Sequence, residues 1–212
     1  MPAIHPIQPV LVVLLAIVLW YIRRKPDDKP TLQYRGKGAG SQPARKSKKA
    51  KEEEAHQLVR QQALQTKRDS LGLPAATSDD EVHGLLMEME IAGSVVTLVC
   101  FANGAARVHY QSGGGLEAGA AHREVHKAAK ELIALGQRSL SRMTKTPTPP
   151  LPEPGKIRFH VLTPRAIFST ETEREAIGQP GNSLTQLFYA GQEVVSQLRQ
   201  AQAETETTER PA

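Results

Sequence analysis

An uncharged apolar run lies close to the start of the chain. Residues 10–22 read VLVVLLAIVLWYI and contain no acidic or basic side chain. At about 1.5 Å per residue the run covers roughly 20 Å, which is short for a hydrocarbon core of about 30 Å. Long basic side chains that follow it can reach the headgroups and lengthen the effective span. We therefore predict a transmembrane anchor within residues 1–22, with Val10, Leu14, Leu15, Val18, Trp20 and Tyr21 as its anchoring side chains.

The residues after this run predict its orientation. Arg23, Arg24 and Lys25 follow directly, and basic residues beside a span stay on the cytoplasmic side. A cleaved secretory signal would instead carry Lys or Arg before its apolar part, and residues 1–9 contain neither. The single cysteine, Cys100, also suits a reducing compartment. We expect a single-pass membrane protein with its N-terminus outside and its C-terminal domain in the cytoplasm.

A basic linker separates the anchor from the rest of the chain. Residues 1–77 carry 14 Lys/Arg against six Asp/Glu, a net charge of +8, whereas residues 78–212 carry 13 against 16, a net charge of −3. The stretch 23–50 is rich in Lys, Arg, Gly and Pro and is expected to be disordered. It is either a solvated spacer or a partner of anionic lipid headgroups. Nucleic-acid binding is disfavoured, because the folded part is acidic.

The remaining chain alternates between two periodicities. A period of two predicts strands, a period of 3.6 predicts helices, and prolines and glycines mark the loops. We expect a two-layer α+β domain at 78–200, in which two helices cover one face of a five-stranded antiparallel sheet in the order βββαββα. A short helix and linker precede it at 51–77, and 201–212 forms a disordered acidic tail. The expected strands are 83–91, 95–102, 106–110, 156–163 and 166–170, and the expected helices are 51–70, 120–139 and 182–200.

Loop lengths set the expected pairing of the first three strands. Asn103-Gly104 is typical of a two-residue hairpin turn, which pairs Val99 with Val108. A three-residue loop at 92–94 then brings Met87 against Val99. This register predicts an apolar strip edged by charge on the second face of the sheet, and the face is either covered by the 51–70 helix or left for a partner. The expected interaction face consists of Leu86, Glu88, Val96, Leu98, Arg107 and His109.

Three groups of residues are candidates for chemistry. Gly113, Gly114 and Gly115 either cradle an anion or form a turn that needs positive φ. His122 and His126 have metal-ligand spacing on a helix, but two ligands alone do not make a catalytic zinc site, and a solvated helix face is favoured. In the expected register Cys100 lies beside Arg107 with His109 near, but no oxyanion hole can be assigned. We expect no cofactor, no metal and no enzymatic activity.

These features predict a membrane-anchored protein-interaction or scaffolding module. Its partners would be the lipid bilayer and a second protein, or a second copy of the chain. The alternative is a membrane-tethered sensor of a small ligand or anion, or a small enzyme, that uses residues 113–115. The proline-rich segment 145–154 is expected to be an extended loop between a helix and a strand.

Overall fold

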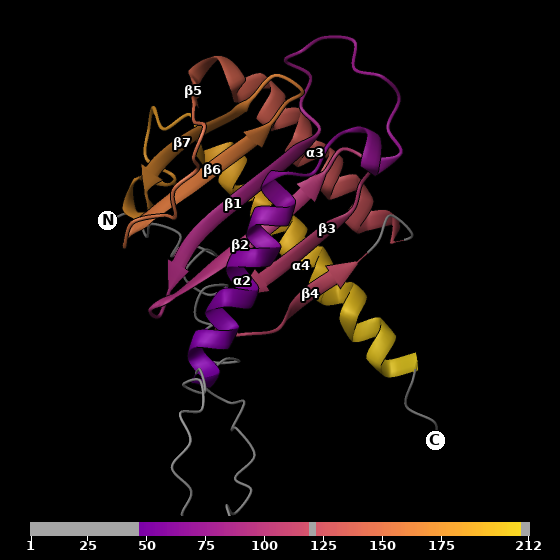
Figure 1. Cartoon of the computed structure of the whole chain (residues 1–212), viewed down its shortest axis with the longest axis vertical. Helices are drawn as coiled ribbons and strands as arrows, with labels where there is room; N and C mark the ends of the chain where they lie inside the picture. The colour runs from indigo at the N-terminus through magenta and orange to yellow at the C-terminus, as the bar shows by residue number, and fades with distance from the viewer. Residues whose placement is uncertain (1–46, 119–121, 209–212) are drawn as a thin grey trace, which may run out of the picture. The chain divides into compact units, whose positions relative to one another are not determined.

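A seven-stranded antiparallel sheet forms the centre of the part of the chain that the structure describes, residues 47–118 and 122–208 of a computed structural model. The strand order is β4-β3-β2-β1-β6-β7-β5 (Figure 1). The α+β class is confirmed, but the expectation of five strands is wrong, because β4 and β5 were not foreseen. Each is too short to display a period of two. The strands are β1 Gly84–Ile91, β2 Ser94–Phe101, β3 Ala106–Tyr110, β4 Gly115–Ala118, β5 Thr144–Lys145, β6 Lys156–Leu162 and β7 Ile167–Glu173.

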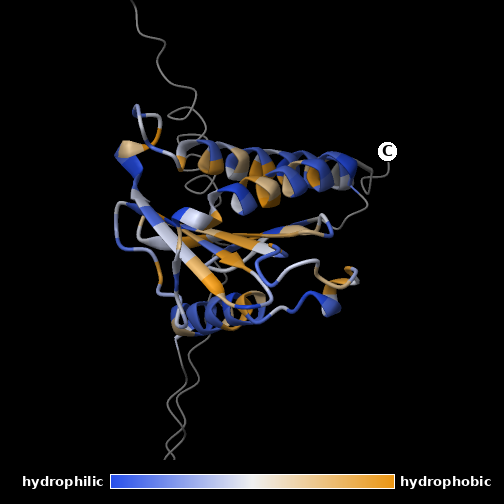
Figure 2. Ribbon diagram, turned by 90° about the horizontal axis from the view of Figure 1, so that it is seen from above, coloured by the Kyte–Doolittle hydropathy of each residue, from blue (hydrophilic) through white to orange (hydrophobic). Residues whose placement is uncertain are grey.

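Helices cover both faces of the sheet, so the domain has three layers where two were expected. Helices α3 (Arg123–Ser139) and α4 (Thr185–Thr208) lie on one face, and α2 (Lys48–Leu64) lies on the other (Figure 2). The apolar sides of α3 and α4 approach the sheet closely at two glycines. A Cβ atom on Gly136 would lie 2.8 Å from Leu85 Cδ1, and one on Gly191 would lie 2.7 Å from Met87 Sδ. These glycines let both helices pack directly onto the apolar side chains of β1.

The predicted register is wrong for one strand, β2. Ala92 and Gly93 both have positive φ (52° and 75°) and form a two-residue loop, so Met87 lies opposite Leu98. The second hairpin has the longer loop: Gly104 donates its N–H to the carbonyl of Phe101, and the Phe101 N–H is bonded to the carbonyl of Ala105.

The first loop is one residue shorter than predicted, and the second is one residue longer. The two differences cancel between β1 and β3, whose side chains keep their predicted faces. The side chains of β2 alone point to the opposite faces. Because β2 is apolar on both of its faces, its composition could not reveal the slip. Val99 and Thr97 therefore face α2, and Leu98 and Cys100 face α3 and α4.

The bounds of all three helices also differ from the expectation. Helix α2 begins at Lys48, where the Ser47 hydroxyl caps the Ala50 N–H, and ends at Leu64, before a 3-10 turn at Asp69–Leu71. Helix α4 continues to Thr208 and so takes in most of the expected tail. Helix α3 begins at Arg123.

The predicted anchor at 10–22 and the basic residues Arg23, Arg24 and Lys25 lie outside the described residues. Within the described ranges, no helix has both the length and the apolar character needed to cross a bilayer.

Candidate functional site

A bidentate ion pair lies buried between α2 and the centre of the sheet. Arg60 on α2 donates from Nε to Glu88 Oε1 and from a terminal nitrogen to Glu88 Oε2, each at 2.8 Å. The Glu88 side chain is fully buried and that of Arg60 is 9% exposed. A parallel arrangement of two such bonds fixes geometry as well as charge. The pair therefore sets the position of α2 on β1.

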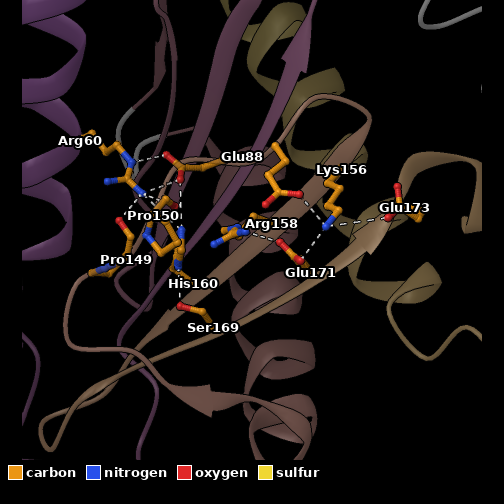
Figure 3. A network of polar contacts seen from close by, with 11 residues as sticks. Arg60, Glu88, Pro149, Pro150, Lys156, Arg158, His160, Ser169, Glu171 and Glu173 are labelled. Carbon is orange, nitrogen blue, oxygen red and sulfur yellow. Dashed lines mark hydrogen bonds and ion pairs between the residues drawn. The ribbon is translucent and has the colours of Figure 1, made fainter.

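Two further strands complete the coordination of the Glu88 carboxylate. The Thr97 hydroxyl on β2 donates to Oε1 at 2.9 Å, and His160 Nε2 on β6 lies 3.1 Å from Oε2. His160 Nδ1 is in turn 2.7 Å from the Ser169 hydroxyl on β7 (Figure 3). We call Arg60, Glu88, Thr97, His160 and Ser169 the Glu88 cluster. With both oxygens accepting two hydrogen bonds, the carboxylate is fully satisfied inside the protein.

The Glu88 cluster keeps its carboxylate ionised. Burial alone would raise the pKa of Glu88, but the hydrogen bonds from His160 and Arg60 and the charge of Arg60 outweigh burial and lower this pKa to about 2. A buried charge with several donors is stable as a set and costly to break, because removing one partner leaves the other in a low-dielectric interior.

The proline-rich segment is held by the same arginine. A terminal nitrogen of Arg60 also donates to the carbonyl oxygens of Pro149 and Pro150, at 3.1 and 3.0 Å. The prediction of a loop that leads into a strand is confirmed, but the segment runs from β5 to β6 and so follows a short strand, where a helix was expected. Arg60 thus joins α2, the sheet and this loop at one point.

A second network of charges lies on the same sheet but near its surface. Lys156 on β6 pairs with Glu153 at 2.8 Å and with Glu171 on β7 at 3.1 Å, and Arg158 also pairs with Glu171 (Figure 3). Burial would raise the pKa of Glu171, but Lys156 and Arg158 lower it. These side chains are partly exposed, so their pairs are screened by water and hold the β6–β7 hairpin more weakly.

The structure divides the six expected interaction-face residues between two sides of the sheet. Leu86, Glu88, Arg107 and His109 lie on the face toward α2, as expected. Val96 and Leu98 lie on the opposite face, a correction that follows from the inversion of β2. Of the two alternatives for this face, the structure shows the first, with the α2 helix lying over it.

The glycines at 113–115 form the turn into β4. Gly113 and Gly114 have positive φ (93° and 77°), and the Gly113 N–H donates to the Tyr110 carbonyl. Any Cβ on Gly115 would collide with the carbonyl oxygen of Val108 on the neighbouring strand. Close packing of β4 on β3 is therefore enough to explain the glycine at position 115. Gly113 and Gly114 form the turn and also border a pocket.

The other two candidates for chemistry are not assembled as sites. His122 precedes the first turn of α3 and His126 packs against Gly104; the described ranges contain no group of three metal-ligating side chains. Cys100 is fully buried, which raises its thiol pKa. The expected proximity of Cys100 to Arg107 and His109 is wrong, because Cys100 faces the α3 and α4 layer and the other two face α2.

The outer surface of the α3 and α4 layer carries a shallow groove of about 400 Å³. Tyr189, one of two large hydrophobic residues that are prominently exposed among the described residues, is 40% exposed and lines it. Ala128, Leu135 and Ala190 supply further apolar surface. Charged side chains of both signs, Glu131, Arg138 and Glu193, border the groove.

Comparison of the chain with family models, with curated proteins and with solved structures found no match. The site must therefore be interpreted from its own geometry.

Sequence reasoning missed Arg60, Thr97, His160 and Ser169. One signal was present: Glu88 and His160 each interrupt an apolar strand, and a charge at the centre of a sheet requires a counter-ion.

Proposed function

We propose that this protein is a single-pass, membrane-anchored module whose cytosolic α+β domain associates with a second copy of itself through the groove between α3 and α4. The observation that carries the proposal is the position of this groove. It lies on the layer opposite α2, and α2 is the element nearest in sequence to the proposed anchor. A domain tethered through one layer leaves the other free to meet a partner.

The composition of the groove supports self-association. An aromatic side chain surrounded by small apolar residues is the usual centre of a protein interface. In a two-fold dimer the same patch meets itself, so its charges must be self-complementary. Arg138 on one copy can pair with Glu131 or Glu193 on the other, because the groove carries both signs of charge. A bilayer that holds the copies at one surface raises their effective concentration.

Cysteine crosslinking in membranes tests the proposal directly. Cys100, the one native cysteine, is buried, so Gln186→Cys, at an exposed position that lines the groove beside Tyr189, introduces the one reactive thiol of the chain. We expect a short bismaleimide reagent to convert this full-length variant into a covalent dimer. Lys130→Cys is the matched control, because Lys130 is exposed on α3 but does not line the groove. Equal crosslinking of the two variants would contradict the proposal.

A charge reversal separates specific association from random collision. Arg138→Glu places an acidic side chain opposite Glu131 and Glu193 of the other copy, so we expect the dimer to weaken roughly tenfold. Lys130→Glu makes the same change of charge on the same helix and should leave the dimer unchanged. The measurement is sedimentation equilibrium of the full chain in detergent. A chain that is monomeric without any substitution, at concentrations reached in the membrane, would refute self-association.

A further inference from the structure

We propose that the contact between helix α2 and the sheet is a pH-sensitive switch, in which α2 is docked while three interface histidines are neutral and detaches when they are protonated. The histidines are His56 on α2, His83 directly before β1, and His109 on β3. Each has a buried ring nitrogen that is bonded to no atom of residues 47–118 or 122–208. The switch lies on the α2 side of the sheet and does not involve the α3–α4 groove.

The hydrogen bonds of His56 show why a proton is unfavourable at this contact. His56 Nε2 lies 3.1 Å from the Thr97 hydroxyl oxygen, and that hydroxyl donates its one proton to the ionised Glu88. Nε2 must therefore carry a hydrogen and donate to Thr97, so Nδ1 is the unprotonated nitrogen. A second proton can bind only at Nδ1, which is buried and has no acceptor within the described ranges. Burial accordingly lowers the pKa of His56.

The other two histidines repeat this arrangement. His83 Nε2 donates to the carbonyl oxygen of Thr66, 3.0 Å away and just beyond the end of α2, and His83 Nδ1 is buried. His109 faces α2 from β3, and its Nε2 is buried as well. Burial lowers the pKa of both rings. Protonation of either would place an N–H in the interior without an acceptor in the described part of the chain, which is unfavourable.

The charged side chains around the three rings do not compensate for an added proton. The basic ones are Lys48, Lys51, Arg60, Arg68 and Arg107, and the acidic ones are Glu52, Glu53, Glu81, Glu88 and Glu117, with Tyr110 beside them. The two signs balance, and the buried Glu88 is already paired with Arg60 and bonded to His160. Positive charges on His56 and His109 would also repel each other.

Apolar contacts hold α2 less firmly than they hold α3. Of the 17 residues of α2 only three are buried, and Ala63 is the one apolar residue among them. Helix α3 has the same length and buries six residues, none of which is polar. The polar contacts of α2 therefore account for a larger part of its docking, so their loss can release α2 while α3 and α4 stay on the sheet.

The linkage between protonation and docking has the same sign for all three rings. A histidine that leaves the contact regains a pKa of about 6.5, and its pKa in the docked state is lower. Docking is therefore strongest above pH 6.5. Below it, each ring lowers the ratio of docked to detached chains by up to roughly tenfold per pH unit. Glu88, whose pKa is lowered to about 2, stays ionised throughout this range.

Detachment would change both the surface and the reach of the domain. It uncovers the α2 face of the sheet, including Leu86 and Val99. The 17 residues of α2, roughly 25 Å long at 1.5 Å per residue, would then join the spacer that precedes the domain. The longer reach depends on the membrane anchor of the proposed function, whereas the release of α2 does not.

Electron spin resonance distance measurements on the full chain, in phosphatidylcholine nanodiscs, test the switch. Spin labels are attached at Gln61→Cys on α2 and Lys130→Cys on α3, which are both exposed positions, while the buried Cys100 stays unlabelled. Dilution with unlabelled chain confines the measured distances to single chains. We expect one narrow distance at pH 7.5, a broad distribution at pH 5, and return of the narrow distance when the pH is raised again.

Histidine variants identify the groups that respond to acid. His56→Gln keeps an N–H for Thr97 and cannot gain a charge, so its docked-to-detached ratio should fall roughly tenfold less per pH unit than that of the natural chain. His109→Gln should have a similar effect and is the decisive variant if His56→Gln does not dock at pH 7.5. His122→Gln is the matched control, because His122 lies at the start of α3 and caps no backbone group. It should respond to acid as the natural chain does.

Three results would overturn the proposal. The first is a narrow distance that persists to pH 5 in the natural chain. The second is an acid response in His56→Gln and His109→Gln as steep as that of the natural chain. The third is reaction of Cys100 with dithiodipyridine at the same pH at which the distance broadens, because Cys100 faces α3 and α4 and its exposure means that the whole domain unfolds. None of these results bears on the α3–α4 groove, so failure of one proposal leaves the other standing.

Discussion

On the face toward α3 and α4, the central strands present apolar side chains, whereas on the face toward α2 an apolar cluster that includes Leu86 and Val99 adjoins a carboxylate, an imidazole and a hydroxyl. Leu85, Met87 and Phe159 on the first face are at most 2% exposed, and so are Glu88 and His160 on the second. Equal burial is thus achieved in two ways. The first depends on apolar area and close packing, whereas the second combines the hydrogen bonds of the Glu88 cluster with an apolar contact that includes Ala63 of α2.

The comparison predicts different tolerances to substitution. An apolar face loses stability in proportion to the atoms removed, because neighbouring side chains can partly fill the gap. A polar cluster loses most of its benefit when one member is removed, because the others remain buried and unsatisfied. The helix held by the polar cluster should therefore detach more abruptly than the two helices held by apolar contacts.

The largest expected effect is that of removing the guanidinium from the Glu88 cluster. Arg60→Met leaves the Glu88 carboxylate buried without its cation, and we expect a loss of about 3–5 kcal/mol in the free energy of unfolding, measured with urea. Gln61→Met, at the exposed neighbouring position on α2, should change it by less than about 0.5 kcal/mol.

A double variant shows whether the loss comes from the stranded charge. In Arg60→Met with Glu88→Gln no buried charge remains, and the new amide can still meet Thr97 and His160. We expect this double variant to recover at least half of the loss. A double variant as unstable as Arg60→Met alone would show that the contacts of Arg60 with Pro149 and Pro150 matter more than its charge.

Acid should weaken the α2 face before it weakens the other. Burial lowers the pKa values of His56, His83 and His109 below 6.5, so each contributes stability that is present above pH 6.5 and is lost as the pH falls. Glu88, with a pKa lowered from 4.5 to about 2, contributes stability that is present above pH 4.5 and is lost toward pH 2. Its share is on the order of 3 kcal/mol.

Urea unfolding of the full chain at pH 7, 5 and 3 measures this dependence. Glu88→Gln removes the group that titrates in the lower range, so its stability should fall less between pH 5 and 3 than that of the natural sequence. An equal decline in both proteins would place the acid sensitivity elsewhere.

The smallest expected effect belongs to the apolar face and tests its packing. A Cβ atom on Gly136 would lie 2.8 Å from Leu85 Cδ1, so Gly136→Ala overpacks the contact of α3 with β1 at a cost of about 1–3 kcal/mol. The better helix propensity of Ala returns about 1 kcal/mol, which leaves a net loss of about 1 kcal/mol in thermal or urea unfolding. Adding Leu85→Val makes room for the methyl group and should reduce the loss. A larger loss of stability in the double variant than in Gly136→Ala alone would contradict the proposed overlap between the new methyl group and Leu85.

What the sequence could reveal follows the same division. The apolar stripes of α3 and α4 and the alternation along β1 and β6 can be predicted from the sequence. One face of each of these elements is much more apolar than the other. β2 was inverted because Val99 and Cys100 are both apolar, so nothing in its composition chose between two loop lengths. Hairpin register there depends on a positive φ at Ala92, a residue that rarely adopts it.

The Glu88 cluster escaped prediction for a different reason. Glu88 lies on the face for which the sequence leaves two alternatives open, cover by the 51–70 helix or a surface free for a partner, and the alternation along β1 does not choose between them. The sequence of helix α2 has no broad apolar face that would predict its contact with the sheet. Of its 17 residues only His56, Arg60 and Ala63 are buried. Because most of the buried side chains of α2 are polar, its hydrophobic pattern does not show which of the two alternatives holds.

The partners of Glu88 are also spread widely along the chain, and this affects how the protein is made. Arg60 and Thr97 are synthesised close to Glu88, but His160 and the carbonyls of Pro149 and Pro150 leave the ribosome at least 60 residues later. At roughly 5–20 residues per second, a nascent chain spends several seconds with β1 paired on one side only. During that interval the unfinished sheet exposes an open edge of β1. Beside this edge the Glu88 carboxylate lacks its hydrogen bond from His160. Chaperones that shield strand edges would therefore act on this protein chiefly between the synthesis of β1 and that of β6.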